Sequence, residues 1–318
     1  MKSTLTHHPG HDIPVILLAG STGVGKTALA IKIAHRLGTE IINADSLQVY
    51  RHMDIGTAKP TLDEQRAARH HLLDVVSPDE SFDAARYVAL ARPIVHEMQR
   101  SGRPPLVVGG TGLYMKTLTK GICPGPPSDP AVRRQLLEEV ETVGTVGLHR
   151  KLTEVDPLVA ARLHPNDRQR ILRALEVFIT SGRRLSQWQE EHGFREEVYP
   201  TIKLFLVRPR EELYDRINRR VDAMMEQGFL DEVRRLLNMG YGPEVKPMQS
   251  LGYKQLARHL LEGTVLADAI DEIKRESRRY AKRQLTWFRS DPELHWLDPS
   301  READVIAWVE SRLAQLTR

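Results

Sequence analysis

The sequence predicts an α/β fold: a parallel sheet flanked by helices, interrupted by an inserted all-helical domain and followed by a helical C-terminal region. Three observations predict it. Strand and helix signals alternate over the first third of the chain. A block of helical signals without strands then follows. One more apolar strand signal, TIKLFLVRP at residues 201–209, comes after that block, so the sheet resumes beyond the insertion.

The first third opens with IPVILLAG, an apolar run that ends in glycine, and continues with KTALAIKIAHRLG, whose apolar residues recur at helical spacing. EIINAD is a second short strand, and FDAARYVALARPIVHEMQRSG is an amphipathic helix. PPLVVGGTGLY repeats the pattern of strand, glycine and helix. Strands that are apolar on both faces and alternate with helices indicate a parallel sheet covered by helices.

The connector KGICPGPPSDP, with four prolines and two glycines in eleven residues, marks a boundary. Helical signals follow it, and Asn166 is the expected N-cap of the helix in NDRQRILRALEV. We therefore divide the chain into a first part of the core at 1–121, an inserted helical domain at 122–195, and core completion with a helical C-terminal region at 196–318.

Composition excludes several classes of protein. Hydrophobic residues make up 41% of the 318 and charged residues 28%, as in ordinary globular proteins. No apolar run approaches the roughly 20 residues of a membrane helix, and the first twelve residues lack the features of a targeting peptide. The single cysteine, Cys123, excludes a disulfide framework and a multi-cysteine zinc site. We expect a cytoplasmic monomer with no membrane partner.

Residues 20–27, GSTGVGKT, match G-x-x-x-x-G-K-[ST] between a strand and a helix, which predicts a P-loop NTPase-like phosphate site. Backbone N–H groups and the helix N-terminus attract phosphate oxygens. The Lys26 side chain would bridge these oxygens, and the Thr27 hydroxyl would ligate Mg²⁺. The predicted phosphate-binding residues are Gly20, Ser21, Thr22, Gly23, Val24, Gly25, Lys26 and Thr27.

The acidic residue that a P-loop phosphotransferase needs on a second strand is missing from its expected place. The LVV strand runs into residues 109–112, GGTG, without an acid. The strand EIINAD does end in one, Asp45, at the sheet edge where ligands bind in open α/β sheets. Asp45 could hold Mg²⁺, act as a general base, or cap a helix in SLQVY.

Basic residues gather in two segments. KRESRRYAKRQLTWFR, residues 274–289, carries seven basic residues against the single Glu276, and RQRILR at 168–173 carries three. Charge runs are usually solvated helix faces, but two of them beside a phosphate loop favour a polyanionic partner, a nucleic acid. Within the first segment we interpret Trp287 and Phe288 as core residues in preference to base-stacking ones.

Six segments together resemble the bacterial tRNA dimethylallyltransferases, in order and over nearly the whole chain: GSTGVGKT, INADSLQVYRHMDIGTAKP, HHLLDVVSPDESFDAARY, VVGGTGLYMKTLTKG, RILRALEV and YAKRQLTWFR. The resemblance implies transfer of a five-carbon isoprenoid from dimethylallyl diphosphate to N6 of the adenosine at tRNA position 37, beside the anticodon. Diphosphate would be the leaving group, and no ATP would be consumed. The implied cofactor is Mg²⁺, and the implied partner is the tRNA anticodon stem-loop.

The same resemblance implies roles for individual residues. Asp45 would be the general base, Thr111 would lie beside the donor diphosphate and the accepting base, and Arg220 would contact the diphosphate. Arg216, one turn earlier, is the alternative to Arg220. The implied tRNA contacts are Asp45, Ser46, Leu47, Gln48, Thr111, Arg133, Gln169, Arg170, Ile171, Leu172, Arg173, Gln249, Ser250, Leu251, Gly252, Tyr253 and Lys254.

Three other functions compete with this one. An adenylate isopentenyltransferase would need neither the helical insertion nor the basic segments. A P-loop small-molecule kinase is disfavoured by the GGTG turn without an acid and by the block around Asp45. A non-enzymatic RNA-binding protein would have no use for the P-loop and Asp45 together.

For His70 and His71 with Asp74 we favour a structural role over a metal site.

Overall fold

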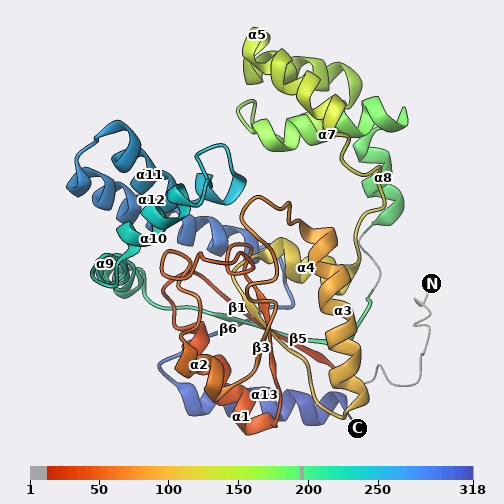
Figure 1. The fold of residues 1–318 in the computed structure, drawn as a ribbon. Coiled ribbons are helices and arrows are strands. Elements are labelled where there is room, and N and C mark those ends of the chain that lie inside the picture. The colour runs from red at the N-terminus through yellow and green to blue at the C-terminus, as the bar shows by residue number, and fades with distance from the viewer. Residues whose placement is uncertain (1–12, 194–196, 318) are drawn as a thin grey trace. The chain divides into compact units, whose positions relative to one another are not determined.

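A computed structural model describes residues 13–193 and 197–317 of the chain (Figure 1). Residues 1–12, on which the prediction of no targeting peptide rests, lie outside the described residues. By its contacts the chain separates into two compact units. The main unit is formed by Met1–Thr119 together with Glu197–Arg318, and the helical unit is Lys120–Glu196.

A six-stranded parallel sheet lies at the centre of the main unit, in the order β3-β2-β4-β1-β5-β6. The strands are β1 (Val15–Gly20), β2 (Ile41–Ala44), β3 (His70–His71), β4 (Leu106–Gly109), β5 (Thr201–Leu206) and β6 (His295–Leu297). The first strand is central because it pairs with β4 on one side and with β5, from beyond the insertion, on the other. The predicted α/β class is therefore confirmed.

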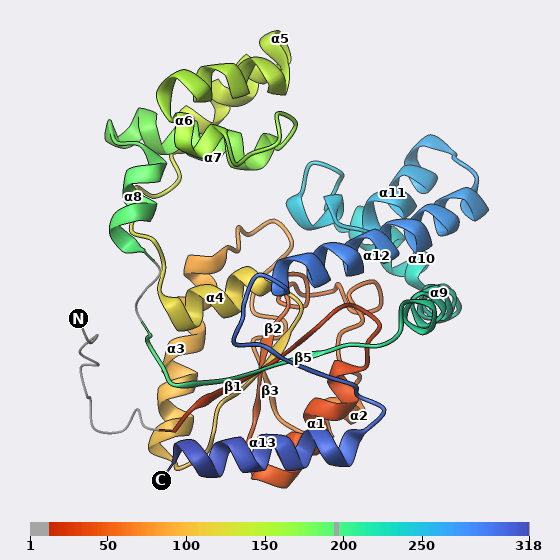
Figure 2. The ribbon, with the colours of Figure 1, turned by 180° about the vertical axis from the view of Figure 1, so that it is seen from behind.

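Helices cover both faces of this sheet, as alternate residues of β1 show. Ile16 and Leu18 pack in one core cluster with α1 (Lys26–Leu37) and α13 (Glu302–Leu316), which lie together in Figure 2. Leu17 and Ala19 point into a second cluster with α3 (Ala84–Arg100). Burial of both faces explains why the central strands are apolar at every position.

The remaining elements of the main unit are α2 (Leu62–Ala67), α4 (Gly112–Lys120), α9 (Arg210–Glu226), α10 (Phe229–Asn238), the 3₁₀ helix η1 (Lys246–Gln249), α11 (Tyr253–Glu262) and α12 (Leu266–Phe288). Inward-facing residues of α9 to α12 join the same core cluster as α3. The C-terminal helices are thus part of the body of the main unit, and no separate core holds them.

The helical unit consists of α5 (Pro130–Val155), α6 (Pro157–Ala160), α7 (Arg168–Ser181) and α8 (Leu185–His192) around its own apolar core. Helix α7 begins one residue later than we expected. Its N-cap is Asp167, whose carboxylate accepts the N–H of Arg170 at 3.3 Å, so the prediction of Asn166 as cap is wrong. The turn from His164 to Asp167 carries the chain past Asn166 before the helix starts.

A buried carboxylate ties the segment after β2 to the C-terminal helices. Glu232 on α10 is 1% exposed. Its two oxygens accept the backbone N–H groups of residues 54–56 at 2.7–3.1 Å, and the Tyr253 hydroxyl donates to it at 2.6 Å. Since the bonds from these backbone groups to Glu232 span more than 170 residues, the segment owes its conformation to a helix far along the chain.

We expect Glu232→Ala to lower the free energy of unfolding by at least about 3 kcal/mol, because each donor that loses its acceptor in a buried site costs about 1 kcal/mol or more. Urea denaturation followed by tryptophan fluorescence measures this loss. Glu226→Ala is the matched control, since Glu226 is exposed at the end of α9, and it should change the stability by no more than about 0.5 kcal/mol. Equal effects of the two substitutions would contradict the prediction.

Candidate active site

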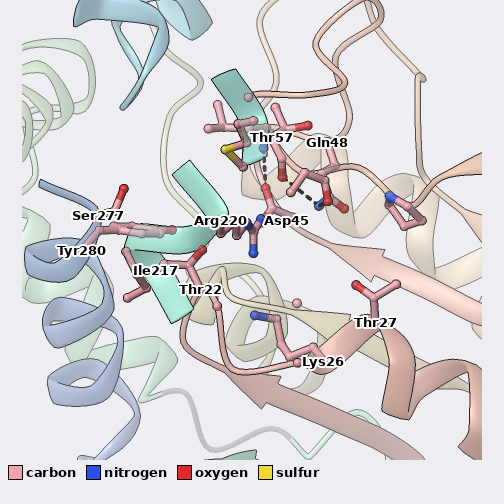
Figure 3. Close-up of a pocket in the computed structure, with 18 of the residues that line it drawn as sticks. Thr22, Lys26, Thr27, Asp45, Gln48, Thr57, Ile217, Arg220, Ser277 and Tyr280 are labelled. Carbon is pink, nitrogen blue, oxygen red and sulfur yellow. Dashed lines mark hydrogen bonds between the residues drawn. The ribbon is translucent and has the colours of Figure 1, made fainter. Parts of the chain in front are cut away.

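A pocket of about 560 Å³ lies at the carboxyl edge of the sheet in the main unit (Figure 3). Strand β1 leads into it through the P-loop, residues 20–27, strand β2 through Asp45, and strand β4 through Gly109. Helices α9 and α12 line the other side. The pocket therefore brings together the P-loop and the acidic strand end that the sequence pointed to.

The backbone carbonyls of the P-loop are held by basic side chains. The bonds run from Lys26 Nζ to Gly20 O (2.9 Å) and Ser21 O (3.0 Å), from Arg216 Nε to Gly23 O (2.9 Å) and from Arg208 Nε to Val24 O (3.0 Å). Gly25, at φ 105°, precedes α1, and neither a side-chain cap nor an acidic residue satisfies the first turn of that helix. Its N–H groups are thus available to an anion in the pocket.

Lys26 and Arg220 line the pocket, and within the described ranges no carboxylate is bound to either of them. Burial and, to a lesser degree, the positive charge of Arg220 lower the pKa of Lys26 to about 8, while Asp45 opposes both effects. Burial also lowers the pKa of Arg220, again against the influence of Asp45. In the described ranges the Arg220 guanidinium forms no hydrogen bond or ion pair. Uncompensated cations at the end of an uncapped helix favour an anionic ligand.

Asp45 follows β2 directly, and no helix begins after it. Its Oδ1 accepts the N–H of Leu47 at 2.9 Å, which is an Asx turn, so the helix-capping interpretation is wrong. Among the described residues no group hydrogen-bonds to Oδ2. Figure 3 shows the carboxylate beside Arg220, within the pocket. One oxygen thus fixes the side chain, and the other is free to accept a proton.

Thr111, in the turn after β4, hydrogen-bonds to Ser46, the residue that follows Asp45. The Thr111 hydroxyl oxygen accepts the N–H of Ser46 at 3.0 Å, and the Thr111 N–H donates to Ala44 O at 3.1 Å. The strand ends approach so closely that a Cβ on Gly109 would lie 2.1 Å from Ala44 O. Thr111 is not among the residues that line the pocket. In this structure it acts on the site through Ser46.

Gln48, three residues after Asp45, ties the segment that follows β2 to residues 57 and 58. Its Nε2 donates to the carbonyl oxygens of Thr57 and Ala58, both at 3.1 Å. Ala58 has φ 47°, a conformation that is uncommon for a residue with a side chain. Ser46, Leu47 and Gln48 all line the pocket, so the segment predicted to contact the substrate base borders the cavity.

The predicted tRNA contacts at 249–254 divide into three groups. Leu251 and Gly252 line the pocket. The Gln249 and Lys254 side chains are exposed, and Ser250 is half-buried. Tyr253 is fully buried, and its hydroxyl bonds to Glu232. Its side chain is therefore not available to RNA, which corrects the prediction for this residue: it faces inward from the first turn of α11.

The predicted tRNA contacts in the helical unit divide in the same way. Ile171 and Leu172 are fully buried in the core of that unit, so their side chains are also not available to RNA. Gln169 and Arg170 are exposed at the start of α7. Arg133 and Arg173 are partly buried around the buried carboxylate of Glu176, at 3.8 and 3.2 Å. Because successive residues of a helix point in different directions, the five predicted contacts at 169–173 face partly into the core and partly towards solvent.

Several pocket residues escaped prediction. An apolar wall is formed by residues at helical spacing on α9, followed by residues of α10 and α12: Ile217, Val221, Met224, Phe229 and Ile273. Their pattern is that of any amphipathic helix, and Arg220 shares the α9 face with them. Gln284 of α12, which bonds to the P-loop, carried no signal of its own. Phe288 packs on Phe205 as a core residue, as interpreted, whereas Trp287 is 41% exposed.

His71 Nε2 donates a hydrogen bond to the Glu40 carboxylate at 2.6 Å, and β3 places His71 next to His70 on a strand. The part of the chain that the structure describes contains no group of three or more His, Cys, Asp or Glu residues suited to a metal. It also contains no helix long and apolar enough to span a membrane.

Comparison with known proteins gives four findings. The family model described as IPP transferase matches residues 48–291. The tRNA dimethylallyltransferase of Syntrophobacter fumaroxidans is 62% identical over 298 residues, which cover 94% of this chain and 87% of that protein. The crystal structure of the tRNA isopentenylpyrophosphate transferase of Bacillus halodurans has 38% identity and a TM-score of 0.72, covering 96% of this chain and 98% of its own.

A eukaryotic dimethylallyltransferase, in structures that capture it acting on tRNA, is also similar, with 31% identity and a TM-score of 0.73. The match covers 90% of this chain and 73% of the eukaryotic one.

The lowered pKa of Lys26 predicts how anion binding depends on pH. Because this ammonium loses its charge as the pH rises through about 8, we expect the Kd of a monoalkyl diphosphate to be constant near pH 7 and to rise up to about tenfold per pH unit above 8. Isothermal titration calorimetry between pH 7 and 9.5 measures this. Lys26→Arg is the control, since an arginine stays charged throughout. A flat profile in the native protein would disprove the assignment.

Proposed function

The chain belongs to the IPP transferase family, and from this membership and the pocket we propose that it transfers a dimethylallyl group from dimethylallyl diphosphate to N6 of the adenosine at tRNA position 37, with release of diphosphate. The observation that carries the proposal is one cavity that joins an anion site to a carboxylate with a free oxygen. A phosphotransferase would need its acid at the end of β4, where Gly109 and Gly110 stand.

The donor diphosphate binds to the N–H groups at the start of α1, to Lys26 and to Arg220. These groups neutralise the charge that grows on the leaving diphosphate as its bond to carbon breaks. Between the two arginines considered, Arg220 is the better ligand because it has no partner within the described ranges. Arg216 already donates to Gly23 O and shapes the loop.

The isoprenoid of the donor lies against the apolar wall of α9, α10 and α12. Burial of each methylene or methyl group from water contributes about 0.8 kcal/mol. The wall also keeps water away from the allylic carbon, which develops positive charge and would otherwise be hydrolysed. Gly23 supports this arrangement, since a Cβ there would lie 2.9 Å from Ile217, so α9 packs directly on the P-loop.

The acceptor adenosine enters beside Asp45. Its N6 lone pair attacks the first carbon of the dimethylallyl group, the bond from that carbon to the diphosphate oxygen breaks, and diphosphate leaves with the electron pair. Asp45 Oδ2 takes the proton that N6 loses as a general base. The base must leave the stacked anticodon loop to reach N6, and Ser46, Leu47 and Gln48 line the cavity that receives it.

The residues present fit a magnesium ion. The Thr27 hydroxyl lines the pocket and has no hydrogen-bond partner in the described part of the chain, and oxygen donors suit Mg²⁺. Thr27 and the diphosphate oxygens would hold the ion, which would supply further neutralisation of the leaving group.

The anticodon stem-loop binds through exposed basic and polar side chains. On α12 and directly after its end these are Arg275, Arg279, Lys282, Arg283 and Arg289. Gln169 and Arg170 of the helical unit and Lys254 of α11 are also exposed and add to this set. Contacts of this kind to phosphates make binding depend strongly on salt concentration. We propose a monomer as the active form, acting on tRNA in the cytoplasm.

The function is tested by incubating the protein with labelled dimethylallyl diphosphate, Mg²⁺ and either unmodified tRNA or AMP, with ATP alone as a further arm. We expect label in tRNA, at the adenosine beside the anticodon. Label only in AMP would establish the adenylate isopentenyltransferase instead. Phosphoryl transfer from ATP without prenylation would establish the kinase.

The role of Asp45 is tested by Asp45→Asn, which keeps an oxygen for the Leu47 N–H but cannot take a proton. We expect turnover to fall by at least about a hundredfold, on the scale of general-base catalysis, with tRNA affinity unchanged in a filter-binding assay. Asp79→Asn is the control, since Asp79 is exposed and forms no bond in the described ranges. Near-normal turnover of Asp45→Asn would exclude Asp45 as the base.

A further inference from the structure

Gln284 on α12 joins two loops that border the pocket. Its Oε1 accepts the N–H of Thr22 in the P-loop at 2.9 Å, and its Nε2 donates to Gly110 O at 3.0 Å. The side chain is 6% exposed. The two partners lie 262 and 174 residues away in the sequence. One amide therefore connects the turn after β1 to the turn after β4.

The turn after β4 is shaped to receive α12. A Cβ on Gly110 would lie 2.2 Å from Gln284 Nε2, and a Cβ on Gly112 would lie 2.1 Å from Trp287 Nε1. A side chain at either position would displace the Gln284 amide or the Trp287 ring. The contact of Gln284 with Gly110 is thus part of a close fit between a helix and a backbone turn.

A path of hydrogen bonds and peptide bonds leads from Gln284 to the proposed base. Gly110 is followed by Thr111, whose hydroxyl oxygen accepts the N–H of Ser46 at 3.0 Å. Ser46 in turn follows Asp45. The P-loop, which holds the donor, is connected in this way to the segment that holds the acceptor base. The amide makes both links because its oxygen accepts the Thr22 N–H and its nitrogen donates to Gly110 O.

We propose that Gln284 is a positioning residue: it sets the distance between the donor carbon on the P-loop side and the N6 amine on the Asp45 side. The inference rests on the proposed transfer reaction. Gln284 borders the pocket, and both of its polar atoms bond to backbone groups of the two loops, so its effect on the substrates runs through these loops. A misplacement of about 1 Å between reacting atoms costs on the order of a hundredfold in rate.

The first experiment is steady-state kinetics of Gln284→Leu with dimethylallyl diphosphate and tRNA. We expect kcat to fall about a hundredfold and both KM values to stay within about threefold. A raised KM with an unchanged kcat would overturn the proposal, because it would indicate a binding role. Gln99→Leu is the control: Gln99 is an equally buried amide, 4% exposed, on α3 away from the pocket, and its kcat should stay within about threefold.

The second experiment is a double-mutant cycle with Thr111→Val, which removes the acceptor for the Ser46 N–H. If Gln284 acts through Thr111, the loss of kcat in the double variant should be about that of the worse single variant. Losses that multiply would overturn the proposal, since the two residues would then act independently. Should Gln284→Leu fail to fold, Gln284→Glu replaces it in both experiments. The glutamate keeps the bond from Thr22 but, when ionised, cannot donate to Gly110.

The experiments on Gln284 can be distinguished from the test of the proposed function. If the native protein does not prenylate tRNA, the proposed function is wrong. If it does, and Gln284→Leu keeps its kcat within about threefold, only the positioning role is wrong.

Discussion

Lys26 and Arg220 share one pocket without a carboxylate bound to either in the described ranges, and much of the main unit depends on this constraint. Burial of an uncompensated charge costs free energy, and the lowered pKa of Lys26 reflects that cost. An anionic ligand relieves it. Asp45 lies close enough to oppose the repulsion between the cations, yet it forms no ion pair with them, so one of its oxygens stays free. A direct ion pair would have occupied the oxygen that the chemistry needs.

The loops around this pocket are held by buried polar side chains from distant parts of the chain. Glu232 accepts the backbone N–H groups of residues 54–56, and Gln284 joins the P-loop to the turn after β4. Thr111 holds Ser46 beside the proposed base. Satisfied polar networks of this kind impose one geometry where apolar packing would allow several. A transfer between two bound substrates requires such precision, because rate depends steeply on the alignment of the reacting atoms.

From the sequence we predicted the α/β class, the resumption of the sheet after the insertion and the proximity of the P-loop to Asp45. Those inferences depend on patterns along the chain, such as apolar strands that end in glycine or an acid. Prediction from the sequence was wrong where a contact depends on the direction in which a side chain points. Tyr253, Ile171 and Leu172 were predicted to touch RNA because they lie in the right segments, but helical geometry turns them into the core. The N-cap of α7 shifted from Asn166 to Asp167 through a turn that propensity alone does not reveal.

By itself, then, the sequence determined the order of strands and helices, the anion-binding loop and the family, because these rest on local spacing and on motifs. Only the tertiary structure decided that Arg220 faces the P-loop with an apolar wall beside it, and that Gln284 connects the loops after β1 and β4. The reason is physical. The parallel sheet brings the carboxyl ends of β1, β2 and β4 to one edge, and the helices that complete the pocket come from more than 100 residues beyond the nearest of these strands. Their register over the pocket is set by packing, which no local pattern specifies.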